Sequence, residues 1–327
     1  MGTWFVTVDD FNEDNMIDLI ATTGLEQSVT MLLGYGSGSF RTPINFPTGN
    51  DPHYMAVADF NNDKHLDIII VSSTNWVSIL LGYGNGSFGL PTTFAISYSP
   101  SGIAAVDING DNYTDIVVLV SYECDTFLGY GNGSFAPRVS FIVGPHSLGL
   151  VVGDFNNDNH IDIAATLIAD NVVNVFLGHG DGNFRTAIST STLATPREIA
   201  TGDFNGDQKL DLAITSCDSN RLYVFHGFGN GSFRAWRNYP TPKCPAIIAI
   251  DDLNNDNYLD LVIANSGNET FSIFFGDGNA NFGTQMAFPT NDDPVSLAVA
   301  DFNRDGRLDV AAACSTGESI DIFLNVC

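Results

Sequence analysis

Basic side chains are scarce in this sequence. Its 327 residues include only 12 Lys and Arg against 38 Asp and Glu, and the formal net charge is −26. A protein that binds nucleic acid by neutralising phosphates needs a basic face, so this class of function is excluded. Glutamate is also rare, because 6 of the acidic residues are Glu and the other 32 are Asp. Short Asp side chains predominate in turns and ion sites rather than on solvated helix faces.

Long apolar runs are absent as well. No run approaches the roughly 18 residues needed to cross a bilayer, so we expect no membrane insertion by this chain. No secretory signal is visible at its start. The five cysteines are too few for a disulfide scaffold, and their odd number leaves at least one unpaired within the chain. With 44% hydrophobic and 15% charged residues, the chain is not a disordered acidic tail.

A nine-residue Asp motif occurs seven times. It has the form D-x-N-x-D-x-x-x-D, and successive copies are 49, 48, 47, 49, 49 and 49 residues apart, starting at Asp10, Asp59, Asp107, Asp154, Asp203, Asp252 and Asp301. A second motif, G-x-G-x-(G/A)-x-F, follows the first six copies and ends at Phe40, Phe88, Phe135, Phe184, Phe233 and Phe282. A fixed period of this length indicates a repeat architecture.

Short β-rich runs separate these motifs, and no segment has helical periodicity. Four strands per repeat predict one four-stranded antiparallel sheet, and seven such sheets predict an all-β, seven-bladed β-propeller. We expect a single domain over 1–327, with blades at approximately 1–50, 51–99, 100–145, 146–195, 196–243, 244–292 and 293–327. The last blade should be three-stranded, because the sequence ends after its third strand at 319–325. The outer strand of that blade would have unpaired backbone groups. This predicts either that the domain belongs to a longer protein or that two copies associate edge to edge through blade 7.

Together, the Asp motif and the Phe-Gly motif resemble the FG-GAP/VCBS repeats of integrin α-subunit head propellers. The resemblance covers essentially the whole chain. It implies an extracellular or cell-surface, calcium-loaded propeller that serves in binding, with its ligand on the face opposite the calcium loops. It leaves the identity of the ligand open.

Each Asp loop is expected to bind one Ca²⁺, about seven in all. The ligands would be the carboxylates at positions 1, 5 and 9, the Asn at position 3 and the main-chain carbonyl at position 7. An all-oxygen set suits Ca²⁺ better than Mg²⁺, and the absence of Cys or His side chains from the set disfavours zinc and copper. The predicted metal ligands are Asp10, Asn12, Asp14, Met16 and Asp18; Asp59, Asn61, Asp63, His65 and Asp67; Asp107, Asn109, Asp111, Tyr113 and Asp115; Asp154, Asn156, Asp158, His160 and Asp162; Asp203, Asn205, Asp207, Lys209 and Asp211; Asp252, Asn254, Asp256, Tyr258 and Asp260; and Asp301, Asn303, Asp305, Arg307 and Asp309.

Three further expectations concern these loops. The sixth residue should adopt a left-handed turn conformation, which makes Lys64 and Gln208 slightly strained copies. The apolar residues at positions 2 and 10, and the Phe of the glycine motif, should pack into the core. Most of the acidic charge should lie in buried cation sites, so that bound Ca²⁺ would reduce the net charge to about −12. The ions are expected to be structural, and contact between an ion and a ligand is the alternative.

The face opposite the Asp loops carries the connections that differ between blades, among them Thr23 to Ser28, and variable loops on a rigid scaffold are where recognition usually resides. Trp76, Tyr98 and Tyr122 are candidates for an exposed aromatic patch there, the alternative being that they pack on neighbouring blades. Strand direction brings Cys217 and Cys244 together on this face, which predicts a disulfide, with two separate thiols as the alternative. The sequons at Asn85, Asn112, Asn132, Asn230 and Asn268 offer glycosylation sites in a secreted protein.

The resulting hypothesis is a calcium-binding adhesion or recognition module, without catalysis, for an extracellular protein or glycan. One alternative is a calcium-dependent carbohydrate-active enzyme, a lyase or hydrolase, which would need basic and aromatic residues converging on the axis. Arg197, Arg221 and Lys243 are the candidates for such a cluster. The other alternative is a repeat scaffold without a ligand.

Overall fold

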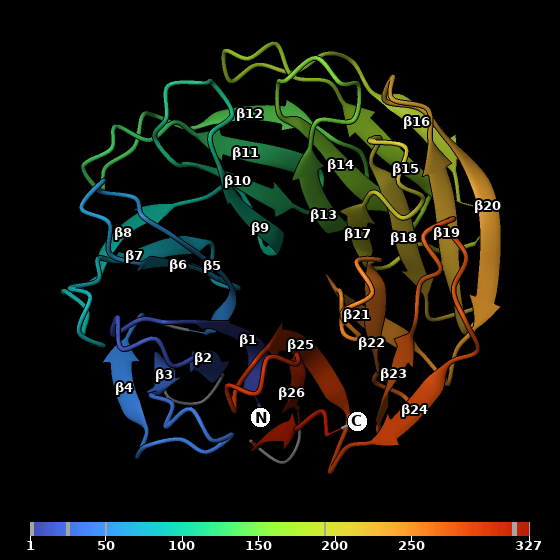
Figure 1. Ribbon diagram of the computed structural model, residues 1–327. Helices are drawn as coiled ribbons and strands as arrows, with labels where there is room; N and C mark the ends of the chain where they lie inside the picture. The colour runs from blue at the N-terminus through green and yellow to red at the C-terminus, as the bar shows by residue number, and fades with distance from the viewer. Residues whose placement is uncertain (1–2, 24–26, 50, 193, 316–318, 327) are drawn as a thin grey trace.

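The computed structural model describes residues 3–23, 27–49, 51–192, 194–315 and 319–326. Over these residues the chain contains strands and no helix, and hence no helix that could cross a membrane. Seven antiparallel sheets stand around a central axis as the blades of a β-propeller (Figure 1). Six blades have four strands and the last has three, so the predicted fold is confirmed, including the three-stranded blade.

The strands follow the chain outward from the axis in every blade. Blades 1 to 3 contain β1 (Thr3–Asp9), β2 (Asp18–Thr23), β3 (Ser28–Leu32), β4 (Ile44–Pro47); β5 (Pro52–Ala58), β6 (Asp67–Ser72), β7 (Trp76–Leu80), β8 (Thr92–Ala95); β9 (Pro100–Val106), β10 (Asp115–Val120), β11 (Glu123–Phe127) and β12 (Val139–Ile142). Blades 4 and 5 contain β13 (Ser147–Gly153), β14 (Asp162–Leu167), β15 (Val172–Phe176), β16 (Ile188–Ser191); β17 (Ile199–Gly202), β18 (Asp211–Ser216), β19 (Arg221–Gly227) and β20 (Phe233–Pro240). Blades 6 and 7 contain β21 (Pro245–Asp251), β22 (Asp260–Asn265), β23 (Thr270–Phe274), β24 (Met286–Pro289); β25 (Pro294–Ala300), β26 (Asp309–Cys314) and β27 (Ser319–Phe323).

The second strand of each blade lies deepest in the protein. In β6, β10, β14, β18, β22 and β26 every residue is buried, since both faces of the strand are covered by neighbouring blades. A strand that is covered on both faces has a continuous run of apolar residues, for example Ile-Ile-Ile-Val within β6. The fourth strands β4, β8, β12 and β24 are mostly exposed at the rim, where only their third residue is partly covered.

Aromatic contacts between blades repeat around the ring. The apolar residue at position 2 of an Asp loop packs against the Phe of the glycine motif in the next blade, as in Phe11 with Phe88 at 6.2 Å between ring centroids. Phe302 of blade 7 makes the same contact with Phe40 of blade 1, at 5.9 Å. The ring is therefore closed by the same ring-to-ring contact that joins blades 1 and 2, 2 and 3, 4 and 5, and 5 and 6. The apolar residues at positions 2 and 10 are buried in all seven copies, as expected.

Candidate functional site

The ninth residue of each Asp loop links the two sequence motifs. Asp67 is fully buried, and its two carboxylate oxygens accept hydrogen bonds from the backbone N–H groups of Phe60 and Gly82, at 2.8 and 2.7 Å. Gly82 is the first glycine of the second motif, and a Cβ there would lie 2.1 Å from the carbonyl oxygen of Leu66. The two motifs occur together because this Asp and this close backbone approach join the Asp loop to the glycine turn.

The same bridge recurs around the ring. The first glycine donates to the ninth Asp in blades 1 to 6 over 2.7 to 2.8 Å. Burial raises the pKa of the ninth Asp to about 6 in five blades, at Asp18, Asp67, Asp115, Asp162 and Asp260. The two backbone hydrogen bonds lower this pKa, and the charges of the neighbouring Asp side chains raise it. A buried carboxylate without a countercharge is costly, so the loop electrostatics favour a bound cation.

The remaining loop residues form a tight turn held by carboxylate-to-amide hydrogen bonds. The backbone N–H of Asp63 donates to the side chains of Asp59 and Asn61, and the N–H of Lys64 donates to Asp59 at 2.7 Å. The sixth residue has positive φ in every copy, including 73° at Lys64 and 64° at Gln208, as expected. The fourth residue is also left-handed in all seven copies, a feature that our sequence reasoning missed. Asn or Gly occupies the fourth position in five of them.

One expectation about the loops is wrong. Only the ninth Asp is fully buried; the first is half-buried, and the fifth is half-buried or exposed, since both lie on the outer turn of the loop. The acidic charge is thus divided between one buried carboxylate per loop and a partly solvated pair.

The donor set was compared with the requirements of a metal ion. Across the described ranges, no group of three or more His, Cys, Asp or Glu side chains is arranged to hold a metal. In blades 2, 3, 4, 6 and 7 the side-chain amide of the third-position Asn donates to the fifth-position Asp, at 2.9 to 3.2 Å. The chemistry of the set nevertheless fits Ca²⁺, because carboxylate, amide and carbonyl oxygens occur together in one short loop. The residues that would hold the ion are those predicted above.

Blade 5 differs from the other blades in one side chain. His226 occupies the place before the first glycine, where blades 1 to 4 have Leu, and it reaches into the Asp loop. Its Nδ1 lies 3.2 Å from Asp211 and 2.8 Å from the Asn205 amide nitrogen, and its Nε2 lies 3.8 Å from Asp207. The Asp motif itself gives no sign of this histidine, but aligning the glycine motifs would have marked it.

In blade 7, Asn325 takes the place of the first glycine. Its backbone N–H donates to Asp309 at 2.7 Å, and its side-chain amide donates to the carbonyl of Leu253 in blade 6 at 3.2 Å. The equivalent carbonyl of Phe60 in blade 2 accepts instead from the third glycine of the next blade, Gly133, at 2.9 Å. One Asn thus supplies both hydrogen bonds that two glycine amides supply elsewhere.

The opposite face carries the divergent connections. Trp76, Tyr98 and Tyr122 are 49%, 53% and 49% exposed, which favours the exposed alternative, and Tyr122 also lies near the ring of His146. The predicted Cys217–Cys244 disulfide is present and joins blades 5 and 6. Cys124 and Cys314 are buried free thiols. The connection Thr23 to Ser28 and Cys327 lie partly or wholly outside the described residues.

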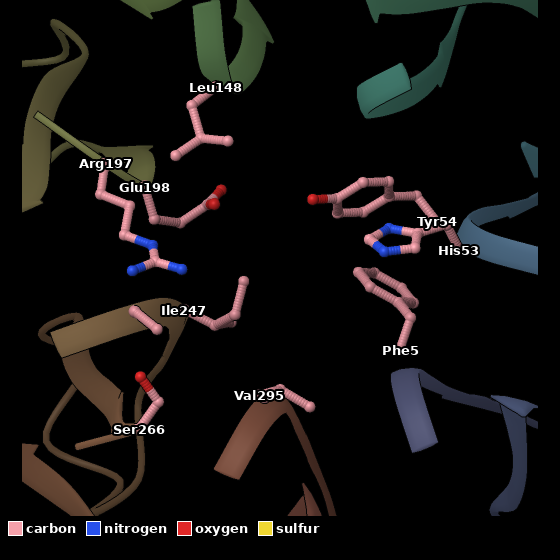
Figure 2. A pocket seen from close by; sticks show the side chains of 10 residues that line it. Phe5, His53, Tyr54, Leu148, Arg197, Glu198, Ile247, Ser266 and Val295 are labelled. Carbon is pink, nitrogen blue, oxygen red and sulfur yellow. The ribbon is translucent and has the colours of Figure 1, made fainter. Parts of the chain in front are cut away.

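A pocket opens at the axis on this opposite face (Figure 2). It has a volume of about 140 Å³ and is lined by residues near the start of the innermost strands, by Arg197 and Glu198 just before β17, and by Ser266. The Glu198 carboxylate and the Tyr54 hydroxyl point toward one another from opposite walls, and the rings of Phe5 and His53 lie beside Tyr54 (Figure 2). The ring centroids of Phe5 and Tyr54 are 6.0 Å apart, and those of His53 and Tyr54 are 4.7 Å apart. Arg197 lines the same pocket, whereas Arg221 and Lys243 do not.

Burial controls the ionisation of this pocket. It raises the pKa of Glu198 to about 8, against a hydrogen bond from the Ile199 backbone and the nearby Arg197 charge, which both lower it. Burial and the Glu198 charge together raise the pKa of Tyr54 to about 12. Burial lowers the pKa of His53, with Asp51 opposing the shift. The axis therefore holds one strongly perturbed acid beside aromatic rings.

The sequence was then compared with known families. A family model described as FG-GAP-like repeat matches residues 10–70, 59–118, 154–214 and 252–312, more than half of the chain. The chain belongs to the FG-GAP-like repeat family. A comparison with curated proteins gives no match.

Solved structures with this propeller architecture are numerous, and their sequences differ widely. BBS1N, crystallised in complex with ARL6DN, superposes with a TM-score of 0.71 at 11% identity, over 98% of this FG-GAP chain and 92% of that chain. A lectin of Agrocybe aegerita that recognises non-reducing terminal N-acetylglucosamine gives 0.65 at 18% identity, over 88% and 80%. A functionally unknown protein from Desulfotomaculum acetoxidans gives 0.61 at 13% identity, over 88% and 90%. At these identities the likeness concerns the fold.

Proposed function

We propose that this FG-GAP propeller is a calcium-binding recognition module that presents its ligand site on the face opposite the Asp loops. The observation that carries the proposal is the contrast between the two faces. The Asp-loop face repeats one hydrogen-bonded loop seven times, as a structural element would, while the opposite face holds a pocket whose lining differs from blade to blade. Recognition on a rigid scaffold resides in such variable positions.

Calcium is proposed as the resident ion of the Asp loops. It would supply a countercharge for one buried and two partly solvated carboxylates in each loop. The chain's own residues bend the loop through left-handed positions 4 and 6, and they connect it to the glycine turn through the ninth Asp. An extracellular location is proposed from the disulfide and the sequons, since disulfides persist in oxidising compartments.

A glycan is the second candidate ligand, favoured by a groove between blades 2 and 3. The groove has a volume of about 420 Å³, and it is lined by Phe94, Phe127 and Phe135 together with Arg138 and Thr92. Aromatic faces beside polar groups suit sugar rings. The lectin of Agrocybe aegerita is a propeller of similar fold that recognises terminal N-acetylglucosamine, which makes that sugar the first to try.

Catalysis is the less favoured alternative. The axial residues His53, Tyr54, Arg197 and Glu198 do converge, as an axial active site would require. We assign them to binding, because Glu198 is the one carboxylic acid among the described residues that line the pocket, and the Tyr54 hydroxyl opposite it stays protonated at neutral pH, its pKa being raised to about 12.

A calcium-dependent binding screen tests the proposal. The protein would be applied to arrays of glycans and extracellular proteins with Ca²⁺ present, then again after chelation. We expect a ligand to be retained with Ca²⁺ and lost together with the fold on chelation. Unchanged thermal melting after chelation would refute the structural ions, and the absence of any ligand would favour a ligand-free scaffold.

A further inference from the structure

One position of the repeat points into the axial channel from the innermost strand. It lies five residues before the first Asp of each loop, and its occupants in blades 1 to 7 are Phe5, Tyr54, Gly102, Gly149, Glu198, Ile247 and Ser296. Four of them, Phe5, Tyr54, Glu198 and Ile247, line both the axial pocket and a second cavity of about 220 Å³. Gly102 and Ser296 also line that second cavity. Six residues far apart in the sequence therefore form one layer of the channel, and Gly149, the seventh, lies against Arg197 and Ile199 of the next blade.

The composition of this layer is asymmetric. Glu198 is its only charged member, and two aromatic rings face it from blades 1 and 2 (Figure 2). In the axial pocket Leu148, Ile247 and Val295 add apolar wall, and His53, Arg197 and Ser266 add polar groups. Gly102 adds no side chain, and Leu150 of the next blade lies against it, with its Cβ 3.1 Å from where a Cβ of residue 102 would stand.

The Glu198 carboxylate lacks a countercharge in direct contact. Among the described residues, no side chain forms a hydrogen bond or ion pair with it, and the backbone N–H of Ile199 is its donor. Arg197 lines the same pocket and its charge lowers the Glu198 pKa, but its Nη1 lies 3.6 Å from the Cys244 sulfur and no ion pair joins it to the carboxylate. A carboxylate partly removed from water and left without a cation gains free energy from a ligand that supplies one.

We propose that the axial pocket binds an alkylammonium group, with the ammonium at the Glu198 carboxylate and the alkyl stem against Phe5, Tyr54 and Ile247. This deepens the proposed function, on which it rests. Aromatic faces attract a desolvated cation, and the aliphatic wall suits its methylene stem. The net charge of −26 raises the local concentration of cations around the protein. The group could come from a free amine or from a lysine side chain of a protein partner.

Pentylamine and a short lysine-containing peptide are the probes, and 1-pentanol is the neutral control of equal length. Binding to the calcium-loaded protein would be measured by calorimetry at about pH 8.5, above the pKa of Glu198 and below that of the amine. We expect pentylamine to bind about tenfold more tightly than pentanol. Equal binding of the alcohol would overturn the proposal.

Variants locate the site. Glu198→Gln keeps the size of the side chain and should weaken pentylamine about tenfold or more, and Phe5→Leu should weaken it by a smaller factor. Asp170→Asn removes one exposed acid from a turn on the same face and is the matched control for nonspecific attraction; it should change affinity by less than about twofold. Equal losses in Glu198→Gln and Asp170→Asn would overturn the assignment. If Glu198→Gln does not fold, Tyr54→Leu with the same probes replaces it; loss of the ring should weaken pentylamine more than 1-pentanol, and equal weakening of the two probes would overturn the assignment.

The two probes distinguish the sources. Glu198-dependent binding of the peptide supports a protein partner, and Glu198-dependent binding of pentylamine alone supports a free amine. Failure of both probes overturns this inference. If the calcium-dependent screen still retains a ligand, the proposed function survives that failure.

Discussion

The two faces of the propeller differ in how far their residues repeat from blade to blade. On the Asp-loop face, blades 1 to 6 use the same bridge from the ninth Asp to the first glycine, and Asn325 reproduces it in blade 7. On the opposite face, the position that lines the channel is Phe, Tyr, Gly, Glu, Ile or Ser according to the blade. The comparison teaches that repetition marks what each blade needs in order to fold, whereas divergence marks what the assembled ring can bind.

Removing calcium should have the largest effect on this comparison, because it acts on all seven loops. Two carboxylates about 4 Å apart repel by roughly 4 kcal/mol at an effective dielectric constant of 20. We expect chelation to lower the melting temperature by more than about 10 °C, as measured by circular dichroism. Added Ca²⁺ should restore the melting temperature more fully than added Mg²⁺ does. Identical melts with and without chelator would contradict ion binding in the loops.

Removing one ninth Asp should have the next largest effect. Asp67→Ala leaves the amides of Phe60 and Gly82 without their acceptor, and we expect a loss of about 4 kcal/mol in the free energy of unfolding, measured by denaturant titration. Asp63→Ala, at a solvent-exposed position of the same loop, should cost less. On the opposite face, Trp76→Ala should change the free energy by less than about 0.5 kcal/mol. Similar losses at Asp67 and Trp76 would remove the distinction between the faces.

Within the described part of the chain, the Cys217–Cys244 disulfide is the one covalent cross-link on the divergent face. It joins residues 27 positions apart, and closing a loop of this length in the unfolded chain is worth about 3 kcal/mol. The double substitution Cys217→Ser with Cys244→Ser should lower the free energy of unfolding by that amount at saturating calcium. An unchanged free energy would show that packing between blades 5 and 6 suffices.

Glu198 should make stability depend on pH. Its folded pKa, about 8, lies above its usual value of 4.5, so its contribution to stability is full at acidic pH and is lost as the pH rises through 8. Glu198→Gln should therefore raise the free energy of unfolding at pH 8.5 by about 1 kcal/mol and leave it nearly unchanged at pH 5. Asp170→Asn is the control, and a pH-independent effect of Glu198→Gln would contradict the buried acid.

The smallest effect is expected at Lys64. Its φ of 73° is left-handed, a conformation that Asn tolerates better than Lys. Lys64→Asn should stabilise the protein by about 0.5 kcal/mol in denaturant titration. A loss comparable to that of Asp63→Ala would instead implicate the Lys64 side chain.

Much of the Asp-loop face could be predicted from the sequence. The spacing of Asp59, Asn61 and Asp63 is local, and a left-handed residue such as Lys64 is required by the turn that such spacing forms. Sequence reasoning failed where a side chain acts across strands. His226 is in the third strand of blade 5 but lies at the Asp loop, and Asn325 replaces a glycine whose role was not apparent from its spacing.

The sequence by itself determined the number of blades and the conformation of the Asp loops, because both depend on a pattern repeated about every 50 residues, and it left the Cys217–Cys244 pair as one of two alternatives until the structure decided it. Only the tertiary structure decided that the ninth Asp is buried while the first and fifth are partly solvated. It also decided that Glu198, Phe5 and Tyr54 share one pocket (Figure 2). These residues come from three blades, and the closing of the ring brings them together, which no local spacing records.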